Sequence, residues 1–250
     1  TEGRESGSGY LGTGNSGSRV GGQRHGGGDG PVILLPSVAE DGASVCPTSL
    51  PARYPLVLVR DLHLSVAGLL AHRIGGPSVF PAIPPDVASQ SFANNFQWKA
   101  SKGPDRYRRG MYTFFKRTAP APNLVTFDCP DSNTSITRRN ISNTPLMALA
   151  TLQNEVFHEA ARALARRIHA DTTLQSDMER VDRLYRLTLA RSPSATERGI
   201  VLKLLADNRA HYRAHPGAAR ELCKEENAEL AAWTATVRIV TNLDEFIICS

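Results

Sequence analysis

Apolar stripes at helical spacing follow one another through the carboxyl-terminal half of the sequence, and this pattern constrains the fold most. The clearest stripe begins near Asn154, and its members recur at offsets of four, seven and eleven residues, on one face of an amphipathic helix. They are Phe157, Ala161, Leu164 and Ile168. Further stripes follow after short connections. This rhythm predicts a mainly α-helical fold of about six helices.

Capping residues and glycines indicate where several of these helices begin and end. Ser194 and Glu197 form a capping box, in which the two side chains satisfy the first free amides of a helix. Apolar residues at three- and four-residue steps predict an earlier helix over residues 56–74, which the following Gly-Gly-Pro sequence ends. The last helix is expected from about residue 228 to residue 248.

The connections in the first half are long and proline-rich. Residues 106–117 alternate basic and aromatic side chains, which fits a strand or a helix equally. The first thirty residues hold twelve glycines and almost no apolar side chains, so we expect a disordered tail there. We therefore divide the chain into a Gly/Ser/Arg-rich head, residues 1–55, and a helical domain, residues 56–250.

Five short motifs of the helical domain occur in a recognisable order. They are IGGPSV at 74–79, YRR at 107–109 continued by TFFKRT at 113–118, TFDCP at 126–130, Arg139 with NTPL at 143–146, and NLDEF at 242–246. Together they resemble the C-terminal part of the domain of unknown function 1553. This is a planctomycete-type domain of large exported bacterial proteins, and the resemblance covers about residues 56–250.

The resemblance implies a setting and no reaction, because the family has no established activity. It implies a protein exported to the periplasm or cell surface of a polysaccharide-degrading bacterium. It also implies a companion domain and a c-type haem segment upstream, hence a link to cytochrome electron transfer. The family should show helical, aromatic-rich sequence before residue 56, which residues 1–55 lack. We therefore hypothesise a reading-frame error or chimeric end there, which translation of the other two frames would test.

Charge and composition limit the classes of binding partner and cofactor that this chain can have. The chain has 29 Lys and Arg against 24 Asp and Glu, a formal net charge of +5. A basic balance suits nucleic acid, an anionic surface or an acidic glycan, and an exported protein would meet anionic polysaccharide, not nucleic acid. No apolar run approaches the roughly 18 residues of a membrane span. The four cysteines lie far apart without a CxxCH motif, so we expect no metal and no haem in this segment.

Asp244 is the acidic residue with the most informative position. A continuous last helix would place it on the apolar face of Trp233, Val237 and Val240, with Glu245 pointing away. A lone buried carboxylate is costly and needs a cationic partner. Arginine is suited to this because its guanidinium can grip a carboxylate in a bidentate fork. The candidates are Arg108, Arg109, Arg138 and Arg139, and we expect an ion pair that locks the last helix in place.

Two functions from different classes remain open. The leading one is an accessory or binding domain, in which an arginine cluster takes an anionic polysaccharide beside the aromatic side chains of Tyr107, Tyr112 and Phe115. This cluster comprises Arg108, Arg109, Lys116, Arg117, Arg138 and Arg139. The alternative is a glycan-acting enzyme that uses Asp128 or Asp244 as an acid or base. An arginine–carboxylate knot in the core would favour a scaffold role, and a concave pocket lined by two carboxylates and arginines would favour the enzyme.

Overall fold

Helices account for most of the computed structural model, which describes residues 52–53, 56–83, 98–116, 120–130, 133–137, 142 and 144–249. The mainly α-helical prediction is confirmed. The α-helices of this part of the chain are α1 (Leu56–Ala67), α3 (Pro122–Thr126), α4 (Pro145–Gln153), α5 (Glu155–His169), α6 (Asp177–Leu189), α7 (Ala195–Ala214), α8 (Pro216–Cys223), α9 (Ala228–Val240) and α10 (Asp244–Ile247). Two short strands, β1 (Ala52–Arg53) and β2 (Ile248–Cys249), pair antiparallel with Ala52 opposite Cys249.

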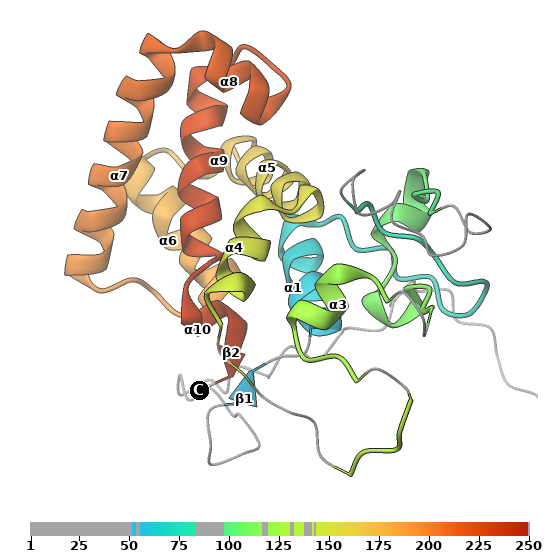
Figure 1. The fold of residues 1–250 in the computed structure, drawn as a ribbon. Coiled ribbons are helices and arrows are strands. Elements are labelled where there is room, and N and C mark those ends of the chain that lie inside the picture. Colours follow the sequence, from blue (N-terminus) through green and yellow to red (C-terminus); the bar gives the residue numbers. More distant parts are fainter. Residues whose placement is uncertain are drawn as a thin grey trace, which may run out of the picture. The chain divides into compact units, whose positions relative to one another are not determined.

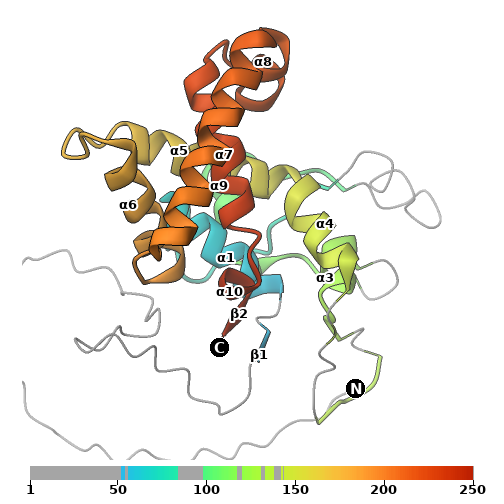
Figure 2. The ribbon, with the colours of Figure 1, turned by 90° about the vertical axis from the view of Figure 1, so that its left-hand side faces the viewer.

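Helix α9 lies at the centre of the packing (Figure 1). It contacts α7 on one side and α5 on the other, and α5 in turn packs against α1. Figure 2 shows the same order from a second side, with α6 and α8 against this group. The sequence of α9 is apolar around most of its circumference, as expected of a buried helix. Its buried Thr234 and Thr236 donate their hydroxyl hydrogens to the carbonyls one turn earlier, at 2.7 and 2.9 Å, which satisfies them inside the core.

The predicted stripe on α5 is confirmed. Its four members are all buried, and the Asn154 side chain caps the helix by accepting a hydrogen bond from the backbone N–H of Val156 at 3.0 Å. The capping box of Ser194 and Glu197 is confirmed at the start of α7. A second box begins α6, where Ser176 and Glu179 exchange the same pair of bonds.

The first helix ends earlier than predicted. It stops at Ala67, because Gly68 adopts a left-handed conformation with φ of 74°. The N–H of Gly68 then bonds to the Ser65 carbonyl, and that of Leu69 to the Leu64 carbonyl, both at 2.9 Å. These two bonds form a Schellman closure. The Gly-Gly-Pro sequence lies in the loop that follows the helix.

The last helix is also shorter than predicted. Helix α9 ends at Val240, and residues 241–243 form a turn before the separate helix α10 begins at Asp244. The guanidinium of Arg191 ties α10 to the start of α7, because it bonds the carboxylates of Glu245 and Glu197, each at 2.6 Å. This Arg191–Glu245 pair was not predicted from the sequence.

The basic segment around residues 106–112 is neither strand nor α-helix. It contains two short 3-10 turns, Gly103–Tyr107 and Gly110–Tyr112, with single bridges from Ala71 to Arg108 and from Val79 to Thr113. The aromatic rings of Phe80, Trp98 and Phe114 pack together beside it, with centroids of Phe80 at 4.9 Å from Phe114 and 5.2 Å from Trp98.

Candidate functional site

A buried charged pair on α1 holds the central basic segment. The Arg60 residue is only 6% exposed, and its guanidinium donates to the carbonyls of Arg108 at 2.5 Å and Arg106 at 2.7 Å. The neighbouring Asp61 is 7% exposed and accepts the backbone N–H of Gly110 at 2.7 Å. Consecutive residues of one helix therefore clamp the backbone of residues 106–110.

Burial shifts the pKa values of both residues of this clamp, Arg60 and Asp61. Burial raises the pKa of Asp61, while the Gly110 hydrogen bond and the charges of Arg60 and Arg109 oppose that rise. The Nε of Arg109 lies 3.7 Å from Asp61 Oδ2, and a guanidinium nitrogen of Arg60 lies 3.8 Å from Oδ1. Burial also lowers the pKa of Arg60, which the charge of Asp61 opposes. The two arginines thus stabilise the ionised carboxylate.

The side chain of Arg108 points away from the clamp, into the loop after α1. It is 1% exposed and donates to the carbonyls of Gly75 and Pro77, the latter at 2.8 Å. Its guanidinium carbon lies 3.9 Å from the centroid of the Tyr112 ring, a cation–π contact. Within the part of the chain that the structure describes, no carboxylate forms an ion pair with Arg108. Backbone carbonyls and an aromatic face therefore stabilise this buried cation.

The structure places Asp244, for which we predicted a buried ion pair, on the surface. Asp244 is exposed, so its predicted burial is wrong. The cause is the turn at residues 241–243, which breaks the helix on which the position of Asp244 had been counted. Arg108 and Arg109 belong to the clamp and its loop. Arg117, Arg138 and Arg139 lie outside the described residues, so a pairing of Asp244 with any of them stays a prediction.

The second candidate acid, Asp128, closes a loop. It follows α3 with a positive φ of 56°, and its carboxylate accepts the backbone N–H of Ser142 at 2.7 Å and the Ser142 hydroxyl at 2.8 Å. These bonds join the two ends of the connection between α3 and α4. They give Asp128 a structural role, and its use as an acid or base stays a prediction.

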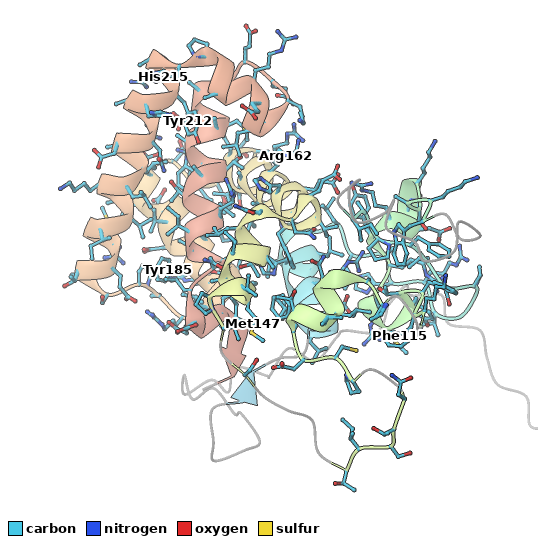
Figure 3. All side chains as sticks on the ribbon, in the orientation of Figure 1. Phe115, Met147, Arg162, Tyr185, Tyr212 and His215 are labelled. Carbon is cyan, nitrogen blue, oxygen red and sulfur yellow. The ribbon has the colours of Figure 1, made fainter. Side chains whose placement is uncertain are left out.

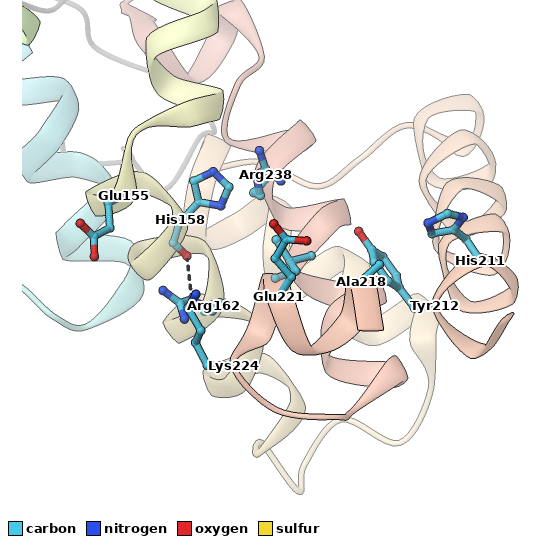
Figure 4. Close-up of a pocket in the computed structure, with 10 residues that line it drawn as sticks. Glu155, His158, Arg162, His211, Tyr212, Ala218, Glu221, Lys224 and Arg238 are labelled. Atoms are coloured by element: carbon cyan, nitrogen blue, oxygen red, sulfur yellow. Dashed lines mark hydrogen bonds between the residues drawn. The ribbon is translucent and has the colours of Figure 1, made fainter. Parts of the chain in front are cut away.

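A pocket between α5, α7, α8 and α9 has the size of a ligand site, and sequence analysis missed it (Figure 4). Its volume is about 530 Å³, within the range of small-molecule sites. The lining residues are Glu155, His158, Arg162, His211, Tyr212, Ala218, Glu221, Leu222, Lys224 and Arg238. Two of them, Arg162 on α5 and Tyr212 on α7, are also labelled in Figure 3. We call this site the helix pocket.

Arg238 is the most constrained cation of the helix pocket. One guanidinium nitrogen donates to the Leu152 carbonyl at 2.5 Å, and its Nε is buried without a hydrogen-bond partner among the described residues. Burial lowers the pKa of Arg238. No described carboxylate forms an ion pair with Arg162, Lys224 or Arg238. Three cations thus line the pocket with two carboxylates, Glu155 and Glu221, neither of which is within ion-pair distance of them.

Burial and the charge of Arg238 both act on the pKa values of two residues of the helix pocket, His158 and Tyr212. Burial, followed by the charges of Arg238 and Arg162, lowers the pKa of His158, so the imidazole is uncharged near neutral pH. Burial raises the pKa of Tyr212, whose hydroxyl therefore stays protonated. The ring of His211 stacks on that of His215 with centroids 4.6 Å apart.

No sequence pattern predicted the helix pocket. Its residues lie on four helices between positions 155 and 238 or, for Lys224, directly after α8, and its charged residues occupy exposed or half-buried positions, where charged side chains are ordinary. The clamp left a better signal, which is the Arg60–Asp61 pair within the otherwise apolar helix α1. Across the residues described, no group of three or more His, Cys, Asp or Glu side chains could hold a metal ion. Within that same set, no helix is both long and apolar enough to cross a membrane.

Comparison with known proteins identifies a family. Residues 43–205 match the family model "PSD1: Protein of unknown function (DUF1553)". This range begins before residue 56, so the sequence likeness extends into the segment assigned above to the head, and a reading-frame error would apply only before residue 43. No curated protein and no solved structure matches the chain. Because the matched range covers well over half of the 250 residues, the chain belongs to the DUF1553 family of unknown function.

Proposed function

We propose that this chain is a binding domain of an exported bacterial protein and that the helix pocket holds an acidic carbohydrate. The observation that supports this proposal is the set of three cations, Arg162, Lys224 and Arg238, that line a ligand-sized pocket without carboxylate partners among the described residues. Arg162 and Arg238 are half-buried, whereas Lys224 is exposed, and half-buried cations are costly to leave unpaired. An anionic ligand would offset that cost.

The remaining lining groups suit a sugar. A guanidinium binds a ligand carboxylate through two parallel hydrogen bonds, and the bond from Arg238 to the Leu152 carbonyl already fixes the position of its guanidinium. Glu221 can accept hydrogen bonds from sugar hydroxyls, and the Tyr212 hydroxyl can donate to them. The ring of Tyr212 offers an apolar face to the sugar carbons. A uronic acid unit combines all these features.

The cellular setting in this proposal comes from the family resemblance. Export to the periplasm or cell surface, a haem-bearing upstream segment and a link to c-type cytochromes are properties that the resemblance implies. A domain that binds anionic polysaccharide fits such an assembly, because it would hold the larger protein at its polymer.

Calorimetric titration of the full chain with digalacturonate tests this proposal, with the neutral disaccharide cellobiose as the comparison. We expect binding of digalacturonate only, and a loss of at least tenfold in affinity for Arg238→Met, since a hydrogen bond to a charged group contributes about 1.5–3 kcal/mol. Arg213→Met, on the exposed surface of α7 outside the pocket, is the matched control and should bind normally. Equal affinity of Arg238→Met and Arg213→Met would overturn the assignment of the pocket.

The enzyme alternative has one specific observation in its favour. The helix pocket is lined by two carboxylates, Glu155 and Glu221, together with arginines, whereas Asp128 is bonded to Ser142. Glu155 also pairs with Arg106 at 3.0 Å, which leaves Glu221 as the better candidate acid or base. Prolonged incubation with polygalacturonate, followed by chromatography, distinguishes the two functions. Cleavage that Glu221→Gln abolishes would favour the enzyme, and binding without cleavage would favour the binding domain.

A further inference from the structure

We infer that the helix pocket couples anion binding to protonation of His158, so that it holds its ligand more tightly as the pH falls. The inference rests on the proposed function, because it requires an acidic group in the pocket. It adds a regulatory property to that site, namely that the same protein binds and releases its ligand according to pH.

The geometry places His158 between the two arginines of the pocket. His158 lies on α5, one turn before Arg162, whose Nε donates to the His158 carbonyl at 3.5 Å. The guanidinium of Arg238 reaches across from α9 to the Leu152 carbonyl, at the end of α4 that precedes α5. Figure 4 shows the half-buried imidazole beside Arg238, with Arg162 on the next turn of the same helix.

Seven other charged or titratable groups line the pocket with His158. They are Glu155 and Arg162 on α5, His211 and Tyr212 on α7, Glu221 on α8 with Lys224 directly after it, and Arg238 on α9. The charges of Arg238 and Arg162 act against the imidazolium form, in addition to burial, while Glu155 and a hydrogen bond to the Leu152 carbonyl act for it. The net effect of these groups and of burial is a lowered pKa of His158.

An acidic ligand group reverses this balance. A carboxylate held by Arg238 and Arg162 neutralises their charges and stands near the imidazole, where an opposite charge within about 4–6 Å raises a histidine pKa by one unit or more. A ligand that raises this pKa must take up protons when it binds, and its affinity must rise as the pH falls. The gain is about tenfold for each unit by which the ligand raises the pKa of His158. It is absent where His158 is neutral in both states and complete where it is protonated in both.

Calorimetry of the full chain with digalacturonate between about pH 5 and pH 8 tests the coupling, because sugar carboxylates stay ionised over that range. Titrations in buffers of different ionisation enthalpy measure the protons taken up. For the wild-type protein we expect proton uptake and an affinity five- to tenfold higher at pH 5 than at pH 8. His158→Gln should bind at pH 8 but lose most of this pH dependence.

His169→Gln is the matched control, because His169 lies on the same helix α5, is exposed and does not line the pocket. It should keep the pH dependence of the wild-type protein. An NMR titration of the His158 ring gives an independent measurement, and it should show a higher pKa with digalacturonate bound. Binding with equal pH dependence in the wild-type protein and His158→Gln would overturn this inference alone. An absence of binding at every pH would overturn the proposed function and this inference together.

Discussion

The buried imidazole of His63 on α1 should make the fold sensitive to acid. It is 3% exposed, with its ring centroid 4.5 Å from that of Phe157 and 4.8 Å from that of Phe246. Its Nδ1 donates to the Val59 carbonyl at 2.8 Å, because a carbonyl oxygen can only accept. Burial lowers the pKa of His63 to about 4, although hydrogen bonds to the carbonyls of Val59 and Thr241 oppose the change.

The size and sign of the effect follow from linkage. The pKa falls from 6.5 in the unfolded chain to about 4 in the folded protein. At 1.36 kcal/mol for each pKa unit, the full effect is about 3 kcal/mol, of which about 2 kcal/mol is expressed between pH 7 and pH 4.5. The unfolded chain binds the proton first. Stability from this group is therefore complete above pH 6.5 and is lost as the pH falls toward 4.

Urea unfolding of the wild-type protein and His63→Gln at pH 7 and pH 4.5 measures this effect. The variant should lose about 2 kcal/mol less than the wild-type protein between the two pH values. Other titrating groups, such as Asp61 and Glu197, are common to both proteins, so their contributions largely cancel in the difference. An equal loss in both proteins would refute the reasoning. Should the variant fail to fold, the His63 resonances of the wild-type protein decide, since titration near pH 6.5 would contradict it.

Two further predictions concern the clamp and the end of α1. Arg60→Met should destabilise the protein by about 3–5 kcal/mol in urea unfolding, because it removes two charged hydrogen bonds to the carbonyls of the central segment and one of the two arginines beside the buried Asp61. The exposed Arg73→Met should cost less than about 1 kcal/mol, and similar losses for the two would contradict the clamp. Gly68→Ala should lower the melting temperature, since it forces alanine into a left-handed conformation at a cost of about 1–2 kcal/mol. Gly199→Ala, in the open interior of α7, should raise it, and a shift in the same direction for both glycines would disprove this reading of Gly68.

Patterns within a few neighbouring residues were enough to predict helix α5 and the start of helix α7. The stripe of α5 and the capping box at Ser194 need no information beyond a few neighbouring residues, and both are confirmed. The two wrong helix ends have different causes. The end of α1 had a local signal, Gly68, which comes before the Gly-Gly-Pro sequence on which the prediction rests. The turn at residues 241–243 contains neither glycine nor proline, so no local stop signal marked the end of α9.

The sequence predicted a contact between a buried carboxylate and an arginine of the central segment, but it did not identify the right carboxylate. One arginine of the central segment, Arg109, does lie 3.7 Å from a buried carboxylate, which belongs to Asp61. The signal available was a charged pair within an apolar helix, which must find partners wherever it is buried. The helix pocket could not have been predicted, because Arg162 and Arg238 come together only when α5 and α9 pack.

The pairing of β1 with β2 has a consequence for how this unit could be handled. It places residue 52 opposite residue 249, so the polypeptide enters and leaves the helical assembly through neighbouring backbone. Units with adjacent entry and exit points tolerate insertion into a loop of another protein and circular permutation. The helical assembly could therefore be joined to an unrelated host at a loop whose two ends are as close together as one pair of strands.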